Sequence, residues 1–219
     1  MARQPIFLPM FEKRCAAGFS TLHSYRHRYC FSTEPLLCRG RDEDVARSFV
    51  AWLHRRRFRC PLVNLRGLDG QGVWLRAPLA ALEQQGMHFR QSEPVQRALL
   101  RIDGGLEAFV AHTPAKKRKE YRRLRERLEA LGELRLEVLQ DSDVLQEWLD
   151  AFIGLELRGW KGREGTALGS RPECRRFFSE VAREAHQRGQ LIMARMSLDG
   201  RPLAMLCDLL APPGRYAFK

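Results

Sequence analysis

The dipeptide Asp199-Gly200 is the sequence feature that most constrains the fold of this chain. It separates two apolar runs, residues 191–197 and 202–210. Asp-Gly tolerates the positive backbone angles of a two-residue turn, so the two runs are predicted to form a β-hairpin. A second turn at Pro212-Pro213-Gly214 precedes another extended stretch, residues 215–219. The end of the chain is therefore predicted to contain three consecutive strands.

The segment before the hairpin is predicted to be helix, strand, helix, helix. Thr113-Pro114 is a helix start and Gly132 a stop, and residues 134–138 alternate as in a half-buried strand. Asp141 or Ser142 can cap the next helix. Pro172 opens another helix that ends at Gly189. The apolar positions that define the first two helices are Tyr121, Leu124, Leu128 and Leu131, then Val144, Leu145, Trp148, Leu149, Phe152 and Ile153.

The first hundred residues alternate between strand-like and helix-like stretches. Residues 29–38 and 61–65 are predicted to be extended, and residues 44–57 to be helical. A second helix is expected to begin with Pro78 at its first position and to run to Gly86, and residues 98–102 form a further predicted strand. The whole chain therefore belongs to the α/β class.

The composition of the chain indicates that it can form a core and in which compartment it functions. The 219 residues are 44% apolar, which is enough for a core, and 38 Lys and Arg against 26 Asp and Glu give a net charge of +12. Six cysteines without a CxxC pair indicate a reduced, cytoplasmic protein. No apolar run has the length of a membrane span, and no signal-peptide core is present.

Four segments carry a resemblance to a known family. They are residues 116–124 with Leu128 and Gly132, residues 160–168 after the long helix, residues 198–204 around the hairpin turn, and residues 215–219. In this order they resemble the CelD-like branch of the GNAT-type acyltransferases, which is associated with cellulose biosynthesis. Each motif alone is modest, but their common order makes a chance match improbable.

The resemblance implies a GNAT-like mixed sheet flanked by helices, arranged in two lobes. Residues 1–112 would be a divergent GNAT-like N-terminal lobe and residues 113–219 the first part of the acyltransferase domain. The family's fourth strand is followed by a helix whose N-terminus binds the pyrophosphate of acyl-CoA. The sequence stops at Lys219, before that segment. We therefore expect the second lobe to be truncated and this chain alone to be inactive.

The implied reaction moves an acyl group from acetyl-CoA or another acyl-CoA to an amine or hydroxyl of a small-molecule or saccharide acceptor. The setting would be polysaccharide or envelope metabolism. Acyl transfer needs a base for the acceptor proton, and Glu156, on the last turn of the long helix, is the candidate. A solvated helix carboxylate is the alternative interpretation of Glu156.

Further site residues follow from the resemblance. The acceptor pocket would include Trp160, Lys161, Arg163 and Thr166, although Trp160 could instead close the core and Thr166 could cap a turn. The backbone of the fourth strand, at Tyr216, Phe218 and Lys219, would pair with the pantetheine amides of the acyl-CoA. The side chain of Lys219 could equally be an edge lysine that discourages aggregation.

An alternative function rests on the basic segment, residues 115–127, which holds eight basic and two acidic side chains. An inactive or truncated lobe could use it to bind an acidic polymer or a protein partner. Nucleic acid is disfavoured because no aromatic platform and no known nucleic-acid signature is present there. A solvated helix face is the simplest interpretation. His23, His27 and Cys30 have no evident fourth ligand, so we expect no metal site.

Overall fold

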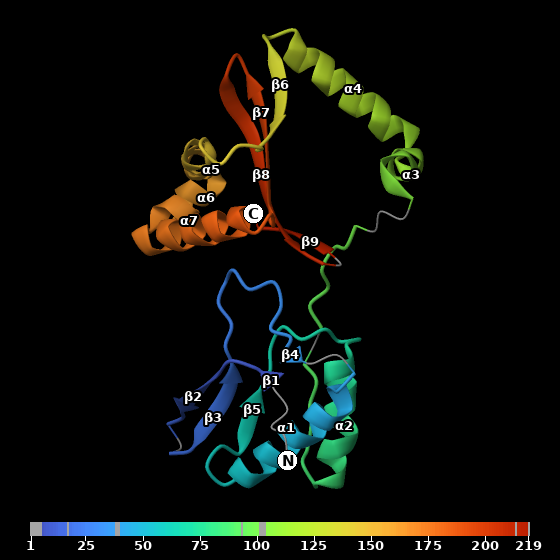
Figure 1. The fold of residues 1–219 in the computed structure, drawn as a ribbon, viewed down its shortest axis with the longest axis vertical. Coiled ribbons are helices and arrows are strands. Elements are labelled where there is room, and N and C mark those ends of the chain that lie inside the picture. Colours follow the sequence, from blue (N-terminus) through green and yellow to red (C-terminus); the bar gives the residue numbers. More distant parts are fainter. Residues whose placement is uncertain are drawn as a thin grey trace. The chain divides into compact units, whose positions relative to one another are not determined.

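The computed structural model describes residues 6–16, 18–37, 40–92, 94–100, 104–212 and 214–218. The chain divides into two compact units, Met1–Leu99 and Leu100–Lys219 (Figure 1). Each unit is described by itself. Both combine helices and strands, so the predicted α/β class is confirmed.

The first unit is built on a three-stranded sheet. Strand β2 (Met10–Arg14) pairs antiparallel with β3 (Ser20–Ser24), and β3 pairs parallel with β5 (Leu62–Asn64). Helix α1 (Asp42–Arg56) packs on α2 (Val73–Gln84), and the short strands β1 (Ile6–Phe7) and β4 (Leu36–Leu37) form a separate antiparallel pair. The core of this unit consists of Leu22, Val45, Ala46, Phe49, Leu53, Cys60 and Trp74.

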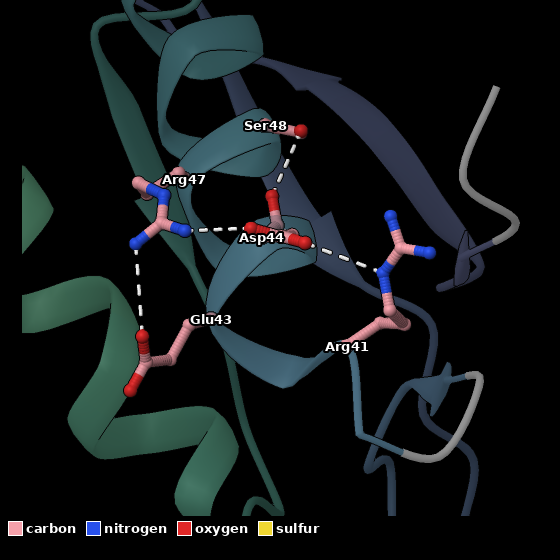
Figure 2. Close-up of polar contacts among 5 residues, drawn as sticks. All are labelled: Arg41, Glu43, Asp44, Arg47 and Ser48. Atoms are coloured by element: carbon pink, nitrogen blue, oxygen red, sulfur yellow. Dashed lines mark hydrogen bonds and ion pairs between the residues drawn. The ribbon is translucent and has the colours of Figure 1, made fainter. Parts of the chain in front are cut away.

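Polar contacts stabilise the start of α1 (Figure 2). The carboxylate of Asp44 accepts a hydrogen bond from Nη2 of Arg47 at 2.6 Å and another from Nε of Arg41 at 3.2 Å. The hydroxyl of Ser48 donates to the carbonyl oxygen of Asp44 at 2.9 Å, and Glu43 lies 3.7 Å from Arg47. The hydrogen bond from Arg47 lowers the pKa of Asp44. Acidic groups in a first turn also complement the helix dipole.

Several predictions for this unit are wrong. Most of residues 29–38 is irregular, and only Leu36–Leu37 forms a strand, while residues 94–100 have no regular structure. Helix α2 begins at Val73 rather than at Pro78, which lies inside the helix and is buried. Proline lacks the N–H that a residue inside a helix donates, and burial of the Pro78 side chain contributes stabilisation that opposes this loss. Residues 101 and 102 of the predicted strand 98–102 lie outside the described residues.

The second unit contains a four-stranded antiparallel sheet of order β6-β7-β8-β9. Strand β6 (Leu134–Val138) is followed by α5 (Leu145–Arg158), α6 (Trp160–Arg163), the 3-10 turn η1 (Leu168–Ser170) and α7 (Pro172–Gln187). Strands β7 (Leu191–Leu198), β8 (Arg201–Ala211) and β9 (Gly214–Ala217) complete the sheet. Helices α5 and α7 lie on the same side of it (Figure 1) and contact β8 and β7 respectively.

The core of this unit lies between the sheet and these two helices. Phe178 of α7 packs against Phe152 of α5 and against Phe218 just after β9, with ring centroids 5.3 and 5.2 Å apart. Met193 of β7 and Cys207 of β8 are fully buried beside them. The predicted apolar face of α5 is therefore confirmed, except that Val144 is exposed.

The predicted hairpin is confirmed. Asp199 and Gly200 have φ values of 48° and 75°, as the two-residue turn requires. The carboxylate of Asp199 accepts a hydrogen bond from the backbone N–H of Glu133 at 2.8 Å. The turn is therefore tied to the residue that precedes β6.

Two helices precede the sheet. Helix α4 (Ala115–Glu129) matches the predicted basic helix, whereas α3 (Gly105–His112) is not predicted from the sequence. Neither helix has a buried residue. Across the part of the chain that the structure describes, no helix combines the length and the apolar character that a membrane crossing needs.

Candidate functional site

The predicted acceptor loop follows α5. It contains two short helical turns, α6 and η1, where the sequence predicted only an irregular glycine-rich loop. Gly159 ends α5 in an extended conformation, and Trp160 begins the single turn α6. A left-handed Gly165, at φ +68°, then allows the chain to reverse toward η1. The backbone N–H groups of Thr166 and Ala167 both donate to the carbonyl oxygen of Lys161, at 2.8 and 3.1 Å. These bonds close the loop on itself.

Glu156 clamps this loop from the last turn of α5. Its Oε2 accepts a hydrogen bond from the backbone N–H of Leu168 at 2.7 Å, and its Oε1 lies 3.2 Å from Nζ of Lys161. The carboxylate is only 8% exposed. The predicted base and the predicted substrate-binding lysine are thus brought together, and Glu156 is not a solvated helix carboxylate.

Trp160, Arg163 and Thr166 lie on the outer side of the same loop. Trp160 is 57% exposed, so it does not close the core, and Nζ of Lys161 lies 5.8 Å from its ring centroid. Arg163 and Thr166 are exposed, and the hydroxyl of Thr166 donates to the carbonyl oxygen of Lys161 at 3.4 Å.

Strand β9 is the edge of the sheet among the described residues. The backbone N–H of Phe218 donates to the carbonyl oxygen of Cys207 at 2.8 Å, and Tyr216 is in register with Leu209. Because main-chain groups alternate in direction along an antiparallel strand, those of Arg215 and Ala217 point away from β8. The free edge is thus formed by residues other than the predicted Tyr216 and Phe218. The remaining predicted position, Lys219, lies outside the described residues.

Sequence reasoning missed a charged network between the sheet and α5. Arg195 of β7 is 17% exposed; its Nε lies 3.2 Å from Glu137 of β6 and its Nη1 2.9 Å from Glu147 of α5. The hydroxyl of Ser197 donates to Glu137 at 3.4 Å. The hydrogen bond from Arg195 lowers the pKa of Glu137. The sequence contains one sign of this network, because Arg195 is a charged residue within the apolar run 191–197.

Two other features of this unit concern possible ligand sites. A shallow depression of about 250 Å³ lies between the start of α5 and the end of α7, and none of the predicted site residues lines it. The described residues contain no group of three His, Cys, Asp or Glu side chains that could hold a metal ion.

The second unit is therefore an α/β domain with helices on one face of an antiparallel sheet and an edge strand that presents main-chain groups outward. The family model described as an acetyltransferase (GNAT) domain matches residues 115–213. Residues 115–213 are thus similar to a GNAT-type acetyltransferase domain, and this match supports a general acyltransferase function. No curated protein and no solved structure matches the chain significantly.

Proposed function

We propose that the chain takes part in the transfer of an acyl group from an acyl-CoA to an amine or hydroxyl acceptor, with a saccharide of polysaccharide or envelope metabolism as the acceptor class. The observation that supports this most strongly is the GNAT match, which covers α4 and every strand of the sheet up to the turn before β9. GNAT domains use acyl-CoA as co-substrate. The CelD-like branch is part of this proposal and rests on the sequence motifs.

The proposed donor site is the free edge of β9. The pantetheine arm of acyl-CoA carries amide groups that can pair with an edge strand as another strand does. The outward main-chain groups of Arg215 and Ala217 fit this pairing. The pyrophosphate would need donors from outside residues 115–218, as the sequence motifs suggest.

The proposed acceptor site is the loop after α5. Trp160 offers an exposed ring, and Lys161 and Arg163 offer positive charge. Glu156 stays the proposed base. Because its carboxylate already binds Lys161 and the N–H of Leu168, an acceptor would have to displace Nζ of Lys161 before giving its proton to Oε1.

The test is an acetyl-transfer assay with labelled acetyl-CoA and panels of amine and saccharide acceptors. It uses the protein as its gene expresses it. We expect transfer to at least one saccharide among the acceptors. No transfer and no acetyl-CoA binding in calorimetry would overturn the proposal.

A further inference from the structure

Helices α3 and α4 expose apolar side chains that the rest of the described chain does not cover. On α4, Tyr121 and Leu124 are 59% and 44% exposed and Leu128 is half-buried. Leu131, two residues after the end of α4, continues the same spacing and is 71% exposed. On α3, Leu106, Phe109 and Val110 are exposed as well. Exposed apolar side chains that recur along a helix mark a binding surface more often than scattered single ones do.

The same region carries half of the chain's excess positive charge. Eight basic and two acidic side chains lie between residues 115 and 127. Lys117 pairs with Glu120 and Arg125 with Glu129. The other six cations have no ion-pair partner within the described part of the chain; they are Lys116, Arg118, Lys119, Arg122, Arg123 and Arg127. The surface therefore combines an apolar stripe with uncompensated charge.

We propose that α4, with α3, binds in the plane of an anionic lipid bilayer. A helix with low overall hydrophobicity, an apolar stripe and a strongly basic remainder is typical of helices that lie at a membrane surface. Leu124, Leu128 and Leu131 would enter the acyl boundary, and the lysines and arginines would contact lipid phosphates. Long basic side chains can reach the head groups from positions beside the stripe.

Two other partners fit this surface less well. A nucleic acid would use the cations of α4 but would leave the leucine stripe exposed to water. A single partner helix would cover one stripe, whereas α3 also exposes three large apolar side chains immediately before α4. A bilayer satisfies both the charge and the apolar area of two consecutive helices. The proposal goes beyond acyl transfer and stands on independent observations.

The experiment is co-sedimentation of the chain with vesicles. One set contains equal parts of phosphatidylglycerol and phosphatidylcholine, and the other contains phosphatidylcholine alone. We expect binding to the anionic vesicles only. Binding should weaken between about 0.1 M and about 1 M salt, because the Debye length falls from about 10 Å to about 3 Å.

Two variants measure separately how much the positive charge and the apolar side chains contribute to vesicle binding. Changing Lys116, Lys117, Arg122 and Arg123 to Gln, or changing Leu124 and Leu131 to Gln, should each lower the partition coefficient about tenfold or more. A matched charge control replaces the exposed Arg14, Arg28, Arg55 and Arg90 of the first unit by Gln. A matched apolar control replaces the exposed Val95 and Leu99 by Gln.

Three outcomes would overturn the proposal. The wild-type chain could fail to bind the anionic vesicles. The charge variant could lose binding while the leucine variant keeps it, which would indicate a general polyanion surface. The leucine variant could also melt at a lower temperature than wild type, which would show that the stripe packs within the protein or against a partner chain.

Discussion

The guanidinium of Arg195 lies over the ring of Trp148, with Cζ 4.5 Å from the ring centroid. Arg195 also pairs with Glu137 and Glu147, so one side chain joins β6, β7 and α5. Removing Arg195 removes the stacking contact and two ion pairs whose carboxylates are 39% and 64% exposed.

We therefore expect Arg195→Met to lower the free energy of unfolding by about 1.5 kcal/mol in urea denaturation. The matched control is Arg175→Met, which removes an ion pair with Asp150 in which both side chains are about half exposed. That change should cost less than about 0.5 kcal/mol. Equal losses in the two variants would contradict the role assigned to Arg195.

The same network makes stability depend on pH. The hydrogen bond from Arg195 holds the pKa of Glu137 below its usual value of 4.5. A depressed pKa stabilises the fold at pH values above the unfolded-state pKa, and this contribution is lost as the pH falls through the lowered value. The free energy of unfolding should therefore fall from about pH 5 to about pH 3, and fall less steeply in Arg195→Met. Parallel curves for the two proteins would count against this pair.

Local signals predicted most of the second unit. The Asp-Gly turn, the alternation of residues 134–138 and Pro172 at a helix start each act within a few residues, and β6, the hairpin and α7 form where these signals place them. The first unit is different. Strands β2 and β3 are held by pairing with each other and by burial of Leu22 among residues of α1 and α2, which no short window reveals.

The candidate site also combines features that the local sequence suggests with features that depend on tertiary packing. Glu156 and Lys161 are five residues apart, and the sequence suggested both, but the hydrogen bond from the N–H of Leu168 depends on how the loop closes. Arg195 meets Glu137 across 58 positions. Such contacts arise from tertiary packing, so the alternation of β7 could show only that a charged residue interrupts an apolar strand.

Glu156 can be tested as a base and as a clamp. Glu156→Gln keeps an oxygen that accepts the hydrogen bond from Leu168 but loses the ability to take a proton. If Glu156 is the base, this variant should keep its melting temperature and lose about a hundredfold or more in the rate of acyl transfer. Lys161→Met is the matched control, because it breaks the ion pair and leaves the carboxylate in place. A Glu156→Gln protein with an unchanged rate would leave Glu156 only its positioning role.

Gly162 is required for the packing of α6 on the end of α5. A Cβ at this position would overlap the backbone carbonyl of Leu157, which cannot move without displacing α5. Gly162→Ala should therefore lower the free energy of unfolding by about 2 kcal/mol or more. At Gly159 the nearest atom to an added Cβ is 3.4 Å away and φ is −81°, so Gly159→Ala is the control. Similar thermal stability in both variants would contradict this packing.

Cys207 should be the least reactive described thiol in the folded protein. It is buried in the core beside Met193, and this burial raises its pKa to about 12, with a smaller contribution from the charge of Asp208. Only the thiolate reacts with alkylating agents, so the thiol of Cys207 should stay unmodified at pH 8 while the half-buried Cys174 reacts. Iodoacetamide labelling followed by peptide mass spectrometry checks this, with a sample in denaturant as the control. Labelling of Cys207 at the rate of Cys174 under native conditions would show that the sheet and its helices open far more readily than this core implies.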